Sequence, residues 1–187
     1  MPRGKSQTDK MKRLILTLTF LILSLVAGGC KGLTFKQATE NMLPTVQVGD
    51  VLFCDPTYYS HSPVERGHIV LIYSPDKKLS DIAGKDTKFM FRIVGVGGDK
   101  VQIKNGRVFV NDKPFDGVLG SGQFPSKEPV EDYGAITIPP DEYFLLGDSL
   151  PFSNDSRFWE RPTIKKDLIY GRVTLLKNGK TGEQRDL

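Results

Sequence analysis

One stretch of this chain decides its fold class: Val101-Gln102-Ile103-Lys104-Asn105-Gly106-Arg107-Val108-Phe109-Val110. Apolar and polar residues alternate on both sides of Asn105-Gly106, which is the residue pair preferred in the two-residue type I′ turn of a β-hairpin. The stretch therefore predicts two antiparallel strands joined by a tight turn. The next four residues, Val110-Asn111-Asp112-Lys113, predict a further tight turn directly after the hairpin.

Short apolar runs continue on both sides of the hairpin. They cover residues 46–48, 51–54, 69–73, 89–96, 143–146 and 169–176, and Gly49-Asp50 forms a turn between the first two. Residues 115–134 are rich in Gly, Pro and Ser and are predicted to be a long loop. No segment after residue 33 holds a long 3.6-residue period. The pattern predicts a mainly β, antiparallel domain over residues 31–187.

The composition excludes several classes of protein. A chain of 187 residues suits one domain plus an appendage. The net charge of +4 comes from residues 1–13, while the remainder balances 21 basic against 21 acidic residues, so no basic surface for nucleic acid is predicted. Two cysteines, Cys30 and Cys54, and two histidines, His61 and His68, predict no disulfide framework, no metal site and no cofactor.

Residues 14–30 form an uncharged apolar segment. At 1.5 Å per residue a helix of this length spans roughly 26 Å, at the short end for a membrane span. The basic residues 1–13 precede it, so we expect a cytoplasmic tail, a single-pass membrane-anchoring helix in contact with lipid, and a domain that faces outward. Two alternatives place the domain similarly: a lipoprotein signal ending at Cys30, after Ala27-Gly28-Gly29, or a cleaved secretory signal.

Four short motifs stand out in the domain. In chain order they are Asn41-Met42-Leu43-Pro44-Thr45 closing on Gly49-Asp50; Arg66-Gly67-His68 before an apolar run; Phe91-Arg92-Ile93-Val94-Gly95-Val96-Gly97-Gly98-Asp99; and Gly147-Asp148-Ser149 leading to Ser153-Asn154-Asp155-Ser156-Arg157-Phe158-Trp159. Together they resemble the motifs of type I signal peptidases, the membrane-bound Ser/Lys endopeptidases that cut leader peptides from exported proteins. The resemblance covers most of the chain after residue 30 and implies a signal-peptidase-like β domain.

The resemblance also assigns the catalytic positions. Asn41 stands at the position of the nucleophilic serine, Phe91 at that of the general-base lysine, and Thr39 at that of a serine that helps the oxyanion hole. A carboxamide is not a useful nucleophile, and a phenyl ring cannot accept a proton. Loss of the nucleophile alone costs a comparable serine protease roughly 10⁶-fold in turnover. We therefore expect no catalysis. Lys88 does not replace the base, because its odd offset from Phe91 directs it to the other face of the strand.

The resemblance implies supporting roles for a further set of residues: Met42, Pro44, Arg92, Ser153, Asp155 and Arg157. Asp155 and Arg157 are expected to form an ion pair within the scaffold. Ser153 matches a serine that binds the lysine amine, and beside Phe91 it is expected to be only a turn hydroxyl. His68 replaces an acid of the family motif and is expected to be a structural residue at a strand end.

The peptide groove does not depend on the missing dyad. In the family the substrate lies extended between two strands, which correspond here to residues 34–41 and 88–91, and such strand addition uses backbone hydrogen bonds. We expect a catalytically inactive protein that binds leader peptides, exported pre-proteins or an export partner. Two alternatives remain: an active signal peptidase with an unrecognised dyad, and a membrane-tethered structural protein.

Overall fold

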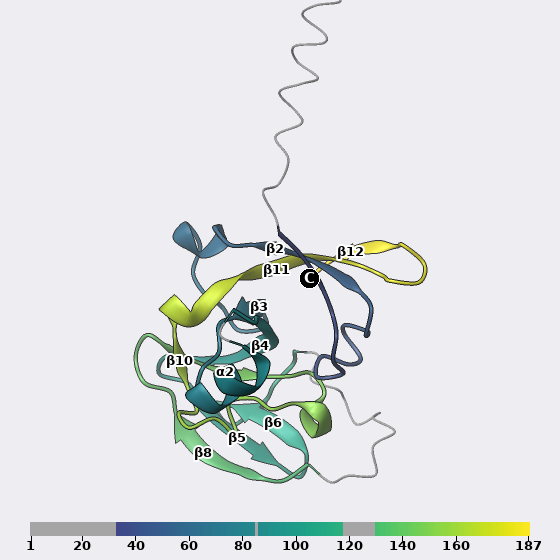
Figure 1. Cartoon of the computed structure of the whole chain (residues 1–187). Helices are drawn as coiled ribbons and strands as arrows, with labels where there is room; N and C mark the ends of the chain where they lie inside the picture. Colours follow the sequence, from purple (N-terminus) through teal and green to yellow (C-terminus); the bar gives the residue numbers. More distant parts are fainter. Residues whose placement is uncertain (1–32, 85, 118–129) are drawn as a thin grey trace, which may run out of the picture. The chain divides into compact units, whose positions relative to one another are not determined.

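The computed structural model describes residues 33–84, 86–117 and 130–187, which fold into two antiparallel sheets (Figure 1). The predicted tail, 1–13, and the apolar segment, 14–30, lie outside the described residues. Within the described ranges, no helix is both long and apolar enough to cross a membrane.

The larger sheet has eight strands, and all its neighbours pair antiparallel. β4 lies between β3 and β9, near the middle of the sheet, and β12 pairs with β11 off the main path. The strand order is β1 (Leu33–Lys36), β2 (Val51–Asp55), β11 (Ile169–Lys177), β3 (Ile69–Ile72), β4 (Phe89–Val96), β9 (Glu142–Leu146) and β10 (Ile164–Lys165), with β12 spanning Gln184–Asp186.

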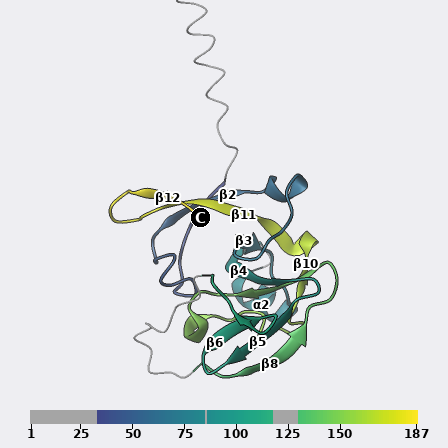
Figure 2. The same cartoon turned by 180° about the vertical axis from the view of Figure 1, so that it is seen from behind.

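The predicted hairpin forms the centre of the smaller sheet. The strand order is β7 (Lys113–Pro114), β6 (Arg107–Val110), β5 (Lys100–Lys104) and β8 (Tyr133–Thr137). Asn105 and Gly106 have φ angles of 50° and 71°, as the type I′ turn requires. Asn111 and Asp112, with φ angles of 52° and 62°, make the second predicted turn. In both views of the ribbon this sheet lies at the end of the domain away from β2 and β11 (Figure 2).

Helical structure in the described residues is limited to one short α-helix and three 3₁₀ turns, so the mainly β class is confirmed. The α-helix begins after Asp76, whose carboxylate accepts a hydrogen bond from the Leu79 amide at 2.8 Å. The elements are α2 (Lys77–Ala83), η1 (Tyr58–Ser60), η2 (Leu150–Phe152) and η3 (Lys166–Leu168).

Three sequence-based boundaries were wrong. Residues 46–48 form no strand: the chain turns there, Val46 is fully buried and Val48 is half exposed. The groove strand predicted for residues 34–41 ends at Lys36, because the chain then enters the turns that carry Asn41. The loop predicted for 115–134 gives way to β8 at Tyr133, which packs against the hairpin.

Side chains on the two faces of β4 enter different parts of the core. Met90 joins a cluster with Met42 and Val46 on one face, which we call the Met42 cluster. Phe91 points to the other face, into a cluster that we call the Trp159 cluster. Its buried members are Tyr59, Val70, Ile72, Phe91, Ile93, Leu145, Trp159 and Ile164. The candidate site lies where β4 meets the loop between β1 and β2.

Candidate active site

The loop of residues 37–50 carries Asn41 and is held by buried anchors. Met42 and Val46 are both fully buried, and the Val46 amide donates to the Met42 carbonyl at 2.9 Å. The Leu43–Pro44 peptide bond is cis. Burial of the two apolar side chains fixes the turn from inside and leaves the Asn41 side chain directed at β4.

The far end of the same loop is closed by Asp50. Its carboxylate accepts hydrogen bonds from the backbone amides of Gln47 and Gly179, both at 2.9 Å, and its backbone carbonyl accepts from the Gln37 amide at 2.9 Å. The loop is therefore tied at its base to itself and to the segment that follows β11.

The Asn41 carboxamide is engaged through both its nitrogen and its oxygen. Its Nδ2 donates to the Met90 carbonyl at 2.7 Å. Its Oδ1 accepts from Gln37 Nε2 at 2.9 Å and from Thr39 Oγ1 at 2.8 Å. We call this set of contacts the Asn41 clasp. It joins the loop to the backbone of β4, and it uses the Thr39 hydroxyl as a donor to Asn41.

Phe91 is buried in the sheet beside this loop. Its side chain packs edge-on against Trp159, with ring centroids 5.3 Å apart and an interplanar angle of 76°. Arg92 pairs with Leu146 at the end of the ladder between β4 and β9, and Gly147 directly follows β9. A Cβ placed on Gly147 would lie 2.4 Å from the Asn41 carbonyl oxygen. The backbone of Asn41 and the segment that follows β9 therefore lie in close contact at Gly147.

Two buried serine hydroxyls adjoin this point. Ser153 Oγ would lie 2.3 Å from a Cβ on Gly147, and the Ser149 amide donates to the Asn41 carbonyl at 2.9 Å. Within the described part of the chain, the hydroxyls of Ser149 and Ser153 have no hydrogen-bond partner. Ser153, expected to be a turn hydroxyl, is therefore a buried and unpartnered group at the candidate site. Ser149 is a second such group, and it was not predicted from the sequence.

A buried ion pair lies on the opposite face of β4 from Phe91. Arg92 Nε donates to Asp148 Oδ1 at 2.7 Å and Nη2 to Oδ2 at 2.5 Å, while Nη1 donates to the Gly67 carbonyl at 2.7 Å. Thr45 Oγ1 also donates to Asp148. Burial raises the pKa of the Asp148 carboxyl, and the hydrogen bonds and charge of Arg92 oppose that rise. The pair connects β4, the segment after β9 and the Asn41 loop.

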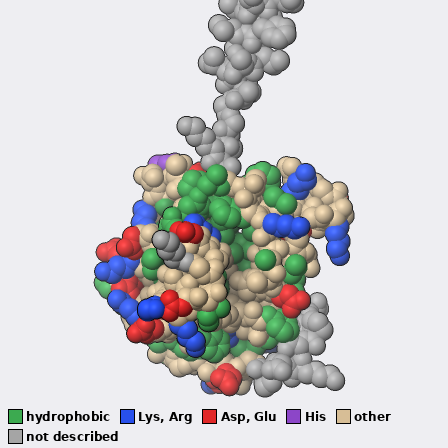
Figure 3. Space-filling model, viewed as in Figure 1, with side chains coloured by type: hydrophobic (Ala, Val, Ile, Leu, Met, Phe, Trp, Pro, Cys, Tyr) green, Lys and Arg blue, Asp and Glu red, His purple; other side chains and the backbone are tan. Residues whose placement is uncertain are grey.

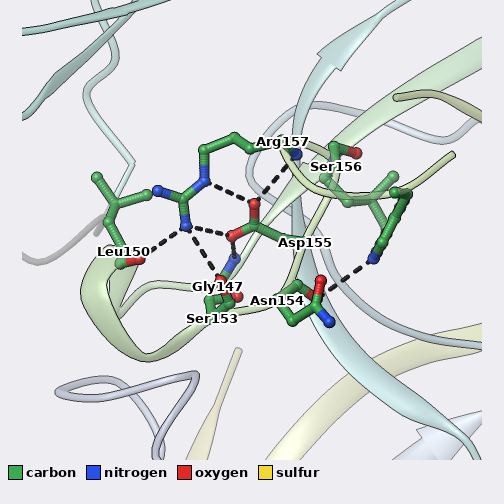
Figure 4. Close-up of polar contacts among 9 residues, drawn as sticks. Gly147, Leu150, Ser153, Asn154, Asp155, Ser156 and Arg157 are labelled. Atoms are coloured by element: carbon green, nitrogen blue, oxygen red, sulfur yellow. Dashed lines mark hydrogen bonds and ion pairs between the residues drawn. The ribbon is translucent and has the colours of Figure 1, made fainter. Parts of the chain in front are cut away.

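The second ion pair, Asp155 with Arg157, holds the segment after η2 (Figure 4). Arg157 Nε donates to Asp155 Oδ1 at 2.7 Å, and both side chains are buried. Arg157 Nη2 also donates to the carbonyl of Leu150 at 2.7 Å, and the Gly147 amide donates to Asp155 at 3.2 Å. This network positions the backbone around Ser153.

Lys88 and His68, the other titratable residues considered in the sequence analysis, both contact aromatic side chains. The Lys88 ammonium lies over the rings of Tyr73 and Tyr170, 4.7 and 5.2 Å from their centroids. His68 contacts the Tyr59 hydroxyl at 3.1 Å, and burial, followed by the charge of Arg172, lowers the pKa of its imidazole. Their positions agree with structural roles. Among the described residues no group of three His, Cys, Asp or Glu side chains is placed to hold a metal ion.

A surface pocket of about 450 Å³ adjoins the site between α2 and residues 151–158, and Ser153 contributes to its wall. Ile82, Phe152 and Phe158 line it and are exposed. Figure 3 shows apolar side chains reaching the surface in several places on one face of the domain. This pocket could not be predicted from the sequence, because one of its walls is α2, a helix that the apolar pattern does not indicate.

Comparisons with known proteins give a consistent result. The sequence model of the family described as "Signal peptidase, peptidase S26" matches residues 10–176. A probable signal peptidase I-2 from Synechocystis sp. is 34% identical over 135 residues, which cover 72% of this chain and 58% of that protein. The signal peptidase I of Leptolyngbya laminosa is 30% identical over 137 residues, which cover 73% of this chain and 64% of that protein. The matched part thus spans less than two thirds of either relative.

A solved structure is also similar. The crystal structure of a signal peptidase I from Enterococcus faecalis aligns with a TM-score of 0.48 and 22% sequence identity, covering 60% of this chain and 98% of that chain.

Proposed function

Because the chain belongs to the signal peptidase family, peptidase S26, we propose that it is a signal peptidase I-like membrane protein that binds leader peptides of exported pre-proteins, or an export partner, without cleaving them. One observation carries the proposal. At the two positions where the family resemblance expects a nucleophile and a base, Asn41 is hydrogen-bonded on both sides of its carboxamide and Phe91 is packed against Trp159.

The chemistry of these two residues supports a silent site. A Ser/Lys mechanism needs a hydroxyl and a neighbouring neutral amine that takes its proton. The Asn41 amide nitrogen is delocalised into its carbonyl and is committed to Met90, and the Phe91 ring has no basic atom. Thr39 donates its proton to Asn41, and the Lys88 ammonium lies over two tyrosine rings. These neighbours do not supply a replacement pair.

The edge of β4 supports peptide binding. The ladder between β4 and β9 begins at Arg92, whereas the ladder with β3 continues to Phe89. No β9 residue pairs with residues 89–91, so an extended peptide can add to the sheet there through its backbone, at the edge where Asn41 now contacts Met90. This addition requires neither a serine nor a lysine.

The attachment of the protein is part of the proposal. We propose that residues 14–30 anchor it, with residues 1–13 in the cytoplasm and the β domain outside. Full-length protein should fractionate with membranes and be digested by protease added from outside. Recovery in the soluble cytoplasmic fraction would contradict this. An intact mass for a chain that begins at a lipid-modified Cys30 would replace the helical anchor with a lipoprotein.

A paired assay tests the function. Full-length protein in detergent is mixed with a pre-protein to measure cleavage, and with its fluorescent leader peptide to measure binding. We expect saturable binding with no cleavage above background. Cleavage that is lost in Thr39→Ala or Lys88→Ala would instead support an active peptidase with a different dyad. Absence of both activities would favour a structural role.

A further inference from the structure

The Asn41 clasp occupies the same backbone group that a bound peptide needs. Met90 lies opposite Leu71 in the ladder with β3, and its carbonyl accepts a hydrogen bond from Asn41. On the β9 side, β4 has no ladder partner before Arg92. The Met90 carbonyl is thus an acceptor of the open edge, and the protein's own carboxamide has already taken it.

Two residues of the loop hold the carboxamide in this orientation. Gln37 Nε2 donates to Asn41 Oδ1 at 2.9 Å and to the Thr39 carbonyl at 2.7 Å, and Thr39 Oγ1 donates to the same Oδ1 at 2.8 Å. With two donors on the oxygen, the Asn41 amide group is directed toward Met90. Gln37 is buried, with 7% of its surface exposed, so its amide is itself fixed.

We propose that the Asn41 clasp is a built-in competitor of the bound peptide, and that Gln37 and Thr39 are positioning residues that set peptide affinity through Asn41. The inference rests on the proposed peptide-binding function. The peptide backbone N–H that pairs with Met90 must displace Asn41 Nδ2, so binding proceeds with exchange of one hydrogen bond for another. Loss of the clasp leaves the acceptor free for the peptide.

The expected effect is modest and measurable. A net hydrogen bond of typical strength corresponds to about a 2- to 10-fold change in a dissociation constant. Asn41→Ala should therefore bind leader peptide about 5-fold more tightly than the wild type. Gln37→Ala removes only one of the two donors that orient Asn41, so its affinity should lie between those of the wild type and Asn41→Ala.

The test measures binding of a fluorescent leader peptide to full-length protein in detergent, by anisotropy. A second peptide series carries a single backbone N-methyl group at each successive residue, which removes one N–H at a time. At one residue, methylation should weaken binding to Asn41→Ala more than binding to the wild type. That residue is the one whose N–H pairs with Met90.

A matched control is provided by the same loop. Gln47 is an exposed glutamine whose Nε2 donates to the Pro44 carbonyl at 3.1 Å. Gln47→Ala removes the same kind of side chain from the same loop without touching the clasp. Its peptide affinity should stay within about twofold of the wild type, and urea unfolding of every variant checks that the domain is folded.

The outcomes separate the inference from the function on which it rests. Peptide binding to the wild type with equal or weaker binding to Asn41→Ala overturns the clasp proposal and keeps the function. The same methylation profile in both proteins also overturns it. If the leader peptide binds Asn41→Ala but not the wild type, the result supports a clasp strong enough to keep the peptide out of the groove. If neither protein binds any leader peptide, the proposed function fails and the clasp proposal fails with it.

Discussion

Replacement of Arg92 by methionine should lower the unfolding free energy, because it leaves the Asp148 carboxylate buried without its cationic partner. Asp148 has no exposed surface, and Arg92 meets it with two hydrogen bonds. Removal of one partner of a buried ion pair typically costs about 3–5 kcal/mol. The Thr45 hydroxyl still donates to Asp148 in the variant, which favours the lower end of that range, whereas the bond to the Gly67 carbonyl is lost as well. We expect Arg92→Met to lose about 3 kcal/mol of unfolding free energy at pH 7.

The destabilisation should depend on pH with a defined sign. Loss of the Arg92 charge raises further the folded-state pKa of Asp148, which burial already raises above 3.8. Between 3.8 and that raised value the folded variant binds a proton that the unfolded chain has released. The unfolding free energy of Arg92→Met should therefore fall as pH rises through this window. Its loss of unfolding free energy relative to the wild type should be smaller at pH 5 than at pH 7.

Urea unfolding of the full-length chain in detergent measures this effect. The single tryptophan, Trp159, is buried and reports on the fold by its fluorescence. The double change Arg92→Met with Asp148→Asn removes the buried charge and should recover part of the loss. Lys77→Ala breaks the exposed pair with Asp81 and, as control, should cost less than about 0.5 kcal/mol. A loss below about 1 kcal/mol for Arg92→Met, equal at both pH values, would refute the reasoning.

Three further predictions concern the site and its surroundings. The double change Asn41→Ser with Phe91→Lys should give weak cleavage after small residues while each single change stays inactive, as a pre-protein assay would reveal; cleavage by either single variant equal to that of the double variant would contradict the assignment of the two positions. Gly147→Ala should destabilise the domain by about 1–3 kcal/mol in urea unfolding, because the added Cβ would lie 2.4 Å from the Asn41 carbonyl oxygen; an unchanged midpoint would count against the packing described. With Cys30 replaced by serine, the Cys54 thiol should react slowly with iodoacetamide at pH 8 until urea is added, because burial raises its pKa to about 12; rapid labelling of the folded protein would show that the thiol is accessible.

The parts of the fold that could be predicted from the sequence are those coded by local patterns. The bounds of β4 agree with the predicted run 89–96, and the Asn105-Gly106 hairpin has the predicted turn. The valines at 46 and 48 show the limit of this approach. Their alternation resembles a strand, but Val46 is buried because the chain turns back on Met42. Helix α2, with seven residues, is too short to show a helical period.

The candidate site likewise has a part that could be predicted from the sequence and a part that could not. The resemblance assigned positions 41, 91 and 153; Asn41 and Ser153 both adjoin Gly147, whereas Phe91 packs against Trp159. The sequence could not show what Asn41 binds. Its contacts with Gln37 and Met90 depend on how the loop turns after Lys36, and that path is fixed by tertiary packing rather than by local propensity.

The contacts that hold the Asn41 loop join residues that are far apart in the sequence, so the loop is completed late in the synthesis of the chain. Asn41 binds Met90, 49 residues further along, and Thr45 binds Asp148, 103 residues further. Gly179 donates to Asp50 at the base of the loop, and Arg185 donates to the Thr45 carbonyl, at separations of 129 and 140 residues. Pairings at such separations form slowly, after distant segments have met. A chain growing from the ribosome therefore cannot complete the contacts of the Asn41 loop until residues 179–185 have been made.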